Sequence, residues 1–344
     1  MNRTELVAKL ELVSYALAQN NLVPVFECFC FNTKTVSCYN DALAIIAPCK
    51  TKDAFAVNGS TLLGLLKNSH ADEVEFSIEN KEDVSIKTGK SRFKLPYFTK
   101  NEFLFEPVDD TWDNSLPIDE AFLKGLEACL LTSSRDLAQP AWLGVSLQPK
   151  GKRMALYSCD GDGVTRHVTG TKATDVTAML PNAFCEAVLR TCKETDCKTG
   201  TLSINADWAK ADLGAYIILG RLIEISTPVD FEHEIENTLK GEPAFIPLPK
   251  GLDHALSRAR VIADPESAKT SLEVGEGKLY LYTETQMGLV KDVLPCPKHA
   301  EVTADVFAAM VQRAIGLCDE IAILDGCTVY RQGETLFMVV SNMG

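Results

Sequence analysis

The chain has 344 residues, too many for one hydrophobic core of ordinary size, so two or three domains are expected. Its apolar content of 46% and charged content of 24% are those of a soluble globular protein, and no apolar run approaches the roughly 20 residues that span a membrane. The formal net charge of −13 argues against a protein that wraps nucleic acid tightly, although basic residues can still gather on one surface.

The first third of the chain has the pattern of two helices with strands between and after them. Asn58 is a suitable capping residue for the second helix. The first helix carries Glu5 and Glu11 and lacks the apolar core of a signal peptide, so a cytoplasmic protein is expected. The periodicity predicts helices at 5–18 and 57–68 and strands at 23–31, 35–40 and within 73–95.

The same order of elements recurs twice more. The second set has helices at 119–131 and 180–191 and strands within 139–163 and 199–219; the third has helices at 251–263 and 302–313 and strands within 268–288 and 320–340. When the segments that start at Val57, Leu180 and Val302 are superposed without gaps, Lys67 falls in the same column as Arg190.

Each repeat therefore predicts an α+β module in which two helices pack on one face of antiparallel sheet. Stretches rich in proline and acidic residues, at 107–117 and 233–249, mark the expected boundaries. The predicted domains are 1–112, 113–240 and 241–344.

The 12 cysteines include no CxxC pair and are expected to be free thiols that pack as small apolar residues. A metal site that joins Cys28 and Cys30 to Cys38 or Cys49 is an alternative, but no metal is expected.

Seven stretches, spread in order over all three repeats, resemble sequences of one known family. They are 62–66 and 73–98 in the first repeat, 140–148, 156–164 and 219–232 in the second, and 251–263 and 337–342 in the third. The family is that of the bacterial beta sliding clamps, the DNA polymerase III beta subunits, and a divergent or phage-encoded member would fit the departures noted below.

The resemblance implies a ring of two three-domain chains, closed head to tail, that encircles duplex DNA. Such a homodimer would hold DNA by topology without sequence specificity, and would tether the replicative polymerase, the clamp loader and other partners through short peptide motifs. The resemblance implies no catalytic residue, no cofactor, no metal and no membrane partner.

The helices of the family line the central hole, so basic residues on these helices are the expected DNA contacts. The alternative for each is an ordinary solvated helix face; the shared column of Lys67 and Arg190 favours a DNA-facing role for those two. The expected contacts are Lys9, Lys67, Lys124, Arg190, Lys193, Arg258, Arg260 and Arg313 on helices, and Arg135 in a loop.

The family also has a peptide groove on its second and third domains. Asp162 and Gly163 replace the histidine and arginine of the family, and Cys159 stands where threonine is usual, so a different preferred peptide is expected. Carried over by position, the groove residues are Leu143, Cys159, Gly161, Asp162, Gly163, Val164, Pro228, Ile235, Met338 and Val340.

The resemblance places the subunit contact between the first domain of one chain and the third domain of the other. Leu95, Phe98, Val261 and Ile262 are the expected apolar contributors, with an intradomain core role as the alternative. The hairpin at 89–98 is expected to be structural rather than a DNA contact through Arg92.

Two other functions remain open from the sequence. Asp160 and Asp162 alternate on a turn and could hold Mg²⁺ or Ca²⁺ in a metal-dependent nuclease, although Asp-Gly pairs are also common hairpin turns. A scaffold of the same fold that binds peptides without encircling DNA is the second alternative.

Overall fold

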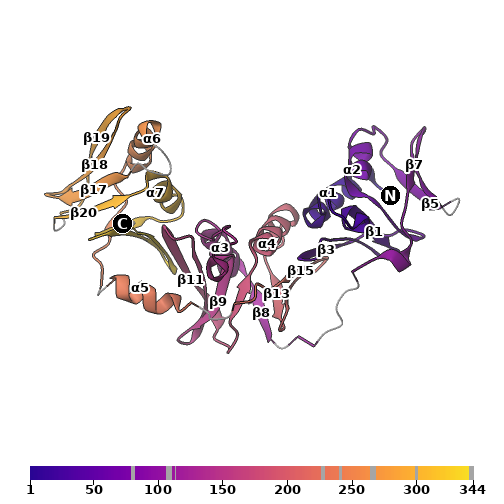
Figure 1. The fold of residues 1–344 in the computed structure, drawn as a ribbon, viewed down its shortest axis with the longest axis horizontal. Helices are drawn as coiled ribbons and strands as arrows, with labels where there is room; N and C mark the ends of the chain where they lie inside the picture. Colours follow the sequence, from indigo (N-terminus) through magenta and orange to yellow (C-terminus); the bar gives the residue numbers. More distant parts are fainter. Residues whose placement is uncertain are drawn as a thin grey trace. The chain divides into compact units, whose positions relative to one another are not determined.

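The computed structural model describes residues 1–78, 82–105, 111–112, 114–225, 229–239, 242–263, 269–298 and 301–340. It is an α+β protein built from antiparallel sheets, as the sequence predicts (Figure 1). The chain divides into two compact units: the first comprises 1–120 and 183–222, and the second comprises 121–182 and 223–344. Among the described helices, none is long and apolar enough to cross a membrane.

The first unit contains three α-helices and eleven strands among its described residues. The helices are α1 (Arg3–Val13), α2 (Gly59–Lys67) and α4 (Asn182–Thr195). The strands are β1 (Cys28–Asn32), β2 (Thr35–Tyr39), β3 (Leu43–Pro48), β4 (Ala54–Asn58), β5 (Val74–Ile78), β6 (Asp83–Thr88), β7 (Ser91–Pro96), β8 (Asn114–Ile118), β13 (Gly200–Ile204), β14 (Trp208–Leu213) and β15 (Tyr216–Arg221).

The second unit contains four α-helices and twelve strands among its described residues. The helices are α3 (Glu120–Cys129), α5 (Phe231–Leu239), α6 (Leu252–Ile262) and α7 (Ala308–Ile315). The strands are β9 (Val145–Lys150), β10 (Arg153–Cys159), β11 (Gly163–Lys172), β12 (Ala178–Leu180), β16 (Ile246–Pro247), β17 (Thr270–Gly275), β18 (Lys278–Thr285), β19 (Gly288–Pro295), β20 (Val302–Val306), β21 (Glu320–Leu324), β22 (Cys327–Gln332) and β23 (Thr335–Val340).

Each unit has one eight-stranded sheet that joins strands of two consecutive repeats. In the first unit the order is β4-β1-β2-β3-β15-β14-β13-β8, and Ile45 of β3 lies opposite Ile218 of β15. In the second unit the order is β12-β9-β10-β11-β23-β22-β21-β16, and Val164 of β11 lies opposite Met338 of β23. Hydrogen-bonded pairing therefore runs across the sequence boundaries between repeats.

The first and third repeats each add a smaller sheet. The first repeat contributes β5-β6-β7, and the third contributes β19-β18-β17-β20. Phe31, Phe55 and Phe76 form an aromatic cluster with ring centroids 4.8 to 5.4 Å apart, which joins β5 to β1 and β4. The small sheet of the first repeat is therefore anchored to the large one through the core.

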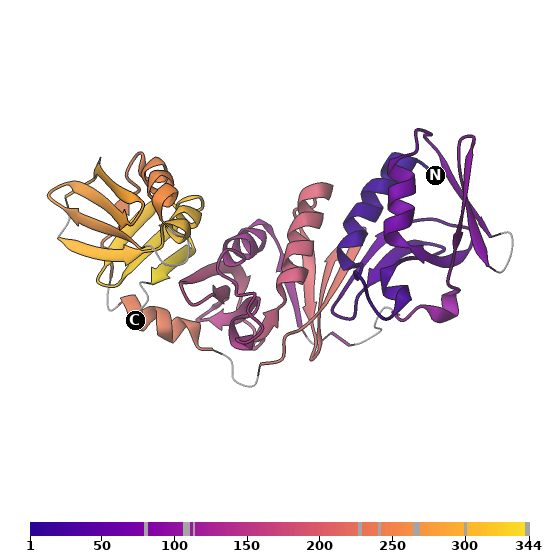
Figure 2. The same cartoon turned by 45° about the horizontal axis from the view of Figure 1, so that its top comes forward.

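The two helices expected in each repeat are present as α1 with α2, α3 with α4, and α6 with α7. Within the units, α1 lies beside α2 and α6 beside α7 (Figures 1 and 2). Asn58 caps α2 as predicted, because its side-chain oxygen accepts the N–H of Thr61 at 3.0 Å.

One helix was not predicted from the sequence. The stretch at 233–249, interpreted as a domain boundary, contains most of α5, which packs on the second sheet through Phe231 and Ile235. This core lies on the sheet face opposite to α6 and α7, so α5 covers a surface that would otherwise face water.

The contact between α4 and β15 depends on the absence of a side chain at Gly220. A Cβ there would lie 2.7 Å from Cβ of Phe184, which is 1% exposed. Replacing Gly220 with alanine should lower the free energy of unfolding by roughly 1–3 kcal/mol through overpacking, measured by urea denaturation. Gly64→Ala is the control in the same unit: a Cβ at Gly64 meets nothing within 4 Å, so this helical change should stabilise by about 0.5–1 kcal/mol. A neutral Gly220→Ala would contradict the packing argument.

Candidate functional site

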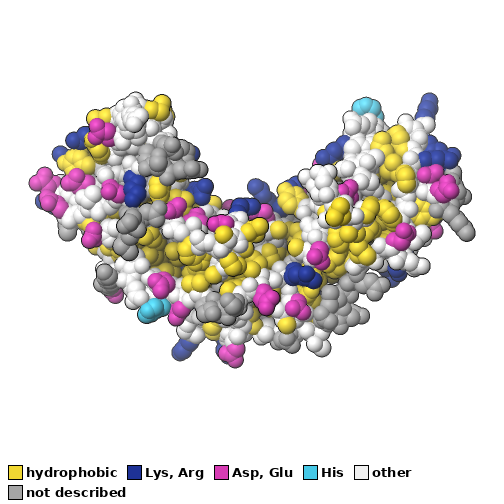
Figure 3. All heavy atoms as spheres, in the orientation of Figure 1, with side chains coloured by type: hydrophobic (Ala, Val, Ile, Leu, Met, Phe, Trp, Pro, Cys, Tyr) yellow, Lys and Arg dark blue, Asp and Glu magenta, His cyan; other side chains and the backbone are white. Residues whose placement is uncertain are grey.

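The face of the second sheet that α5 covers carries an apolar patch. On β23, Leu336 and Met338 belong to the core under α5, whereas Phe337 and Val339 belong to the core under α6 and α7, as strand alternation requires. Figure 3 shows apolar side chains gathered over β9 and β11 beside α5. The half-buried side chains that form the apolar patch are Trp142, Val164, Val229, Leu239, Phe245 and Leu324.

A tight turn between β10 and β11 forms one end of the apolar patch. Cys159 lies opposite Val164, and the carboxylate of Asp160 accepts the N–H groups of Asp162 at 3.1 Å and Gly163 at 2.8 Å. Gly161 has a φ of 96°, which favours glycine, and a Cβ there would lie 3.6 Å from the ring of Trp142. The turn therefore brings its backbone close to Trp142.

Asp160 closes this turn, which leaves it poorly suited to hold a metal. Burial raises the pKa of Asp160 above its ordinary value, although the N–H groups of Gly163 and Asp162 act in the opposite direction. Within the described ranges, no three His, Cys, Asp or Glu side chains gather as a metal ion would require. This arrangement favours the structural interpretation of the Asp-Gly pairs.

The structure brings most of the predicted groove residues together. Val164 lies opposite Met338 in the sheet, and the N–H of Val340 donates to the carbonyl of Asp162 at 2.9 Å. Leu143 joins the same region by a bridge to Ser134. The N–H of that serine donates to the carbonyl of Cys159 at 3.2 Å.

Two other predicted groove residues, Ile235 and Gly163, have different positions. Ile235 on α5 is 1% exposed and belongs to the core beneath the apolar patch. Gly163 faces α7 instead, since a Cβ there would lie 2.8 Å from Cε of Met310. Pro228 lies outside the described residues.

Sequence reasoning missed the polar anchor of α5. Glu232 accepts hydrogen bonds from Lys150, from Arg166 at 2.8 Å and from the Tyr157 hydroxyl at 2.9 Å. Burial opposes ionisation of Glu232, but the hydrogen bond from Lys150, the charge of Arg166 and the Tyr157 hydroxyl outweigh it and lower its pKa. The ring of Tyr157 also stacks on Phe231, with centroids 5.6 Å apart.

The apolar spacing of α5 was the available signal for this anchor. Phe231, Ile235 and Leu239 recur every four residues, which is the period of a helix that buries one face. The partners of Glu232 lie on β9, β10 and β11, so its ion pairs depend on the tertiary fold.

Most of the predicted DNA-contacting cations already have partners within their own unit. Lys67 pairs with Glu11 at 2.7 Å, and Arg190 pairs with Glu194 at 2.5 Å while its guanidinium stacks on the Tyr15 ring. In the second unit, Arg258 bonds to Asp292, Arg260 to Gln312, Lys124 to Gln332, and Arg313 to the carbonyl of Leu131.

These partners do not remove the cations from solvent. Lys67, Arg190 and Arg258 keep 35% or more of their side chains exposed. Exposed pairs of this kind contribute little to stability, so an arriving phosphate can compete for the cation. Lys193 is exposed and Lys9 is half-buried.

The predicted subunit-contact residues differ in exposure. Val261 at the end of α6 is 77% exposed, whereas Leu95 and Ile262 are half-buried. Phe98 is held within its own unit, because its backbone exchanges two hydrogen bonds with Ala56 at 2.8 and 2.9 Å. In the described part of the chain, β7 and β19 each form the edge of a small sheet.

The hairpin at 89–98 forms part of the small sheet of the first repeat. Its strand β7 pairs with β6 along the whole strand, from Ser91 to Pro96. Nε of Arg92 donates to the hydroxyl of Ser85 at 2.7 Å, which holds the arginine against the sheet.

Comparison with known proteins finds the same fold in solved structures. No protein-family model matches the sequence, and no curated protein matches it. A DnaN sliding clamp of Bartonella birtlesii, bound to griselimycin, is 15% identical with a TM-score of 0.88, covering 99% of this chain and 98% of the other. The DNA polymerase III beta subunit of Thermotoga maritima is 16% identical with a TM-score of 0.85, and the match covers 99% of this chain and 97% of the other. The DNA polymerase III subunit beta of Pseudomonas aeruginosa is 14% identical with a TM-score of 0.85, and the match covers 99% of this chain and 98% of the other. The fold expected from the sequence is thereby confirmed.

Proposed function

We propose that this chain, which has the sliding-clamp fold over nearly its full length, is itself a DNA sliding clamp. Two copies would close into a ring around duplex DNA and tether a DNA polymerase and other partners. The observation that carries the proposal is the full-length likeness to solved clamps, with coverage of 97–98% of those chains. In the part of the chain that the structure describes, β7 and β19 are edge strands, so each can accept a strand of a second copy.

Ring closure would repeat the sheet pairing found inside the chain. Each boundary between repeats is bridged by an eight-stranded sheet, while β5-β6-β7 has three strands and β19-β18-β17-β20 has four. Pairing of β7 from one copy with β19 from a second would complete a sheet of the same kind. Leu289 and Val293 on β19 are 57% and 48% exposed, and Val261 lies on the neighbouring helix α6, so apolar side chains are available for this contact.

The helices would face the DNA in such a ring. A closed ring retains DNA by topology, so contacts with phosphates need only be weak and exchangeable, which suits cations that are already paired. The abundance of acidic residues elsewhere would keep DNA from binding non-specifically to the rest of the surface. The role of a sliding clamp requires no catalytic residue, cofactor or metal. A protein with this role would work in the cytoplasm beside the replication machinery. The three predicted domains, 1–112, 113–240 and 241–344, would be the modules of the ring.

The apolar patch is the proposed docking site for partner peptides. Its half-buried aromatic and aliphatic walls suit short apolar motifs, and Asp162 at the turn adds a negative charge. A peptide that places a basic residue beside its apolar anchors would fit this combination.

Val164→Asp tests the apolar patch. The probe is griselimycin, which is bound in the Bartonella birtlesii clamp structure and is proposed to occupy the apolar patch here. A carboxylate placed among half-buried apolar walls is expected to weaken its binding at least tenfold, since an anchor must then displace a hydrated charge. Isothermal titration calorimetry measures the effect, and Leu104→Asp, at an exposed position in the first unit, is the charge-matched control. Absence of binding to the native protein, or equal binding by the Val164→Asp variant, would count against the groove.

The topological test separates the clamp from a non-encircling scaffold. Light scattering should give twice the 37.6 kDa mass of the chain. Protein closed around nicked circular plasmid should survive a high-salt wash and be released when the plasmid is linearised. A monomeric mass, or equal retention on circular and linear DNA, would leave the scaffold as the better interpretation.

A further inference from the structure

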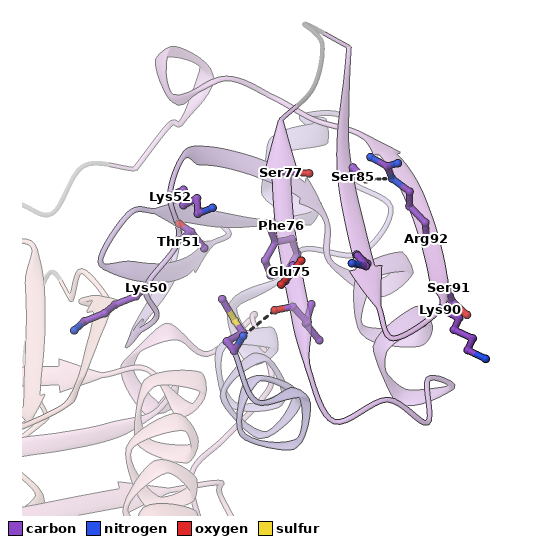
Figure 4. A pocket seen from close by; sticks show the side chains of 13 residues that line it. Lys50, Thr51, Lys52, Glu75, Phe76, Ser77, Ser85, Lys90, Ser91 and Arg92 are labelled. Atoms are coloured by element: carbon purple, nitrogen blue, oxygen red, sulfur yellow. Dashed lines mark hydrogen bonds between the residues drawn. The ribbon is translucent and has the colours of Figure 1, made fainter.

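A basic hollow opens in the first unit, and Met1, just before the start of α1, is part of its lining. Its volume is about 650 Å³, and it lies between the loop that joins β3 to β4 and the sheet β5-β6-β7 (Figure 4). Five basic side chains and one carboxylate line it: Lys50, Lys52, Lys87, Lys90, Arg92 and Glu75. Of these, only Arg92 lies on β7, the strand proposed above to pair with a second copy. In a chain of net charge −13, this is a local reversal of sign.

The sheet register explains how these charges meet. Lys87 on β6 lies opposite Glu75 on β5 and opposite Arg92 on β7, so the three side chains form a row on one face. Glu75 can offset one cation of this row. Lys50 and Lys52 come from the adjacent loop, and the side chains of Lys50 and Lys90 extend outward at opposite sides of the hollow (Figure 4).

The four lysines of this hollow have no ion-pair partner among the described residues. In the part of the chain that the structure describes, Lys50, Lys52, Lys87 and Lys90 form no ion pair, and all four are exposed. The predicted DNA contacts on the helices differ, since most of them already have partners. Unpaired cations around one concave surface raise the local positive potential and attract an anion.

The remaining lining favours phosphate over an apolar partner. Hydroxyl groups of Ser77 and Ser91 stand among the cations, as hydrogen-bond donors for phosphate oxygens, whereas the Thr51 hydroxyl already donates to the carbonyl of Asp53 at 2.8 Å. A hollow of this size, built from a loop and strands, admits a single strand more readily than a duplex. We infer that the basic hollow binds the phosphodiester backbone of single-stranded nucleic acid, a second DNA contact separate from the proposed encirclement of duplex.

Fluorescence anisotropy with a labelled oligothymidylate of about 12 nucleotides tests this inference. When the logarithm of the binding constant is plotted against the logarithm of the salt concentration, four lysine–phosphate contacts give an expected slope of about −2.8. The Lys50→Gln, Lys52→Gln double variant should bind roughly tenfold more weakly and reduce that slope by about 1.4. The Lys278→Gln, Lys298→Gln variant makes the same change of charge at exposed positions in the third repeat and should bind like the native protein.

Several outcomes would overturn the inference. The native protein could fail to bind the oligonucleotide at low salt, or the two double variants could bind equally well. Polyglutamate of the same charge could compete as strongly as the oligonucleotide, which would assign the hollow to acidic peptides. Plasmid retention, measured on the same variants, reports separately on ring closure and should stay unchanged.

Discussion

Replacing Val261 and Leu289 together with aspartate is expected to leave the protein monomeric and to abolish its retention on circular plasmid. Val261 is 77% exposed and Leu289 is 57% exposed, so neither supports the fold of its own unit to a large extent. If they meet a second copy, two buried carboxylates would cost several kcal/mol in each of the two equivalent interfaces. Sedimentation velocity and the plasmid assay measure the two effects together.

The control for this variant is aspartate at Leu22, which is 100% exposed in the first repeat. Leu22→Asp adds charge without touching β7 or β19, so it should leave both the mass and the plasmid retention unchanged. A double variant that remains dimeric would show that β19 and the end of α6 lie outside the subunit contact. Circular dichroism distinguishes dissociation from unfolding.

Glu232→Gln should lower the free energy of unfolding by roughly 2–3 kcal/mol at pH 7. Glu232 holds Lys150, Arg166 and the Tyr157 hydroxyl, and its removal leaves two cations close together with side chains only 28% and 18% exposed. Because α5 is held through this residue, its amides should also exchange faster with deuterium.

The pH dependence of this effect has a definite sign. Folding lowers the pKa of Glu232, so its contribution is present above the unfolded value of about 4.3 and is lost as the pH falls through the folded value. The native protein and the Glu232→Gln variant should therefore differ at pH 7 and converge as the pH falls through the lowered pKa of Glu232. The control is Glu334→Gln: the pair of Glu334 with Arg153 is about half exposed, and its loss should cost less than ~1 kcal/mol. Equal costs for the two variants would contradict a special role for Glu232.

The repeated helices could be predicted because their signals are local. Asn58 caps α2 through the N–H of Thr61, only three residues away. The shared alignment column of Lys67 and Arg190 can be found from the sequence without knowledge of the fold. The ion pair of Lys67 with Glu11 could not be predicted in this way, since it depends on α1 lying beside α2. The pairing of β3 with β15 likewise joins residues far apart in the chain.

The candidate site was predicted better on the sheet than on the connecting segment. Val164 and Met338 were predicted to share one groove, and the structure places them opposite each other in the sheet. The helix α5 was missed because glycine and proline just after residue 240 dominated the interpretation of a short amphipathic pattern. The basic hollow was missed because its lysines come from a loop and from adjacent strands, and the overall acidity of the chain gave no hint of them.

The pairing of β3 with β15 and of β11 with β23 restricts how such a chain can gain or lose repeats in evolution. Deleting one repeat removes strands from the sheet of its neighbour and leaves an unpaired edge that can recruit other chains. Insertions in surface turns avoid this cost, because they leave the ladders intact. The number of repeats can therefore change only by whole modules whose edge strands can pair with those of their neighbours. This favours duplication of complete modules over gradual extension of the chain.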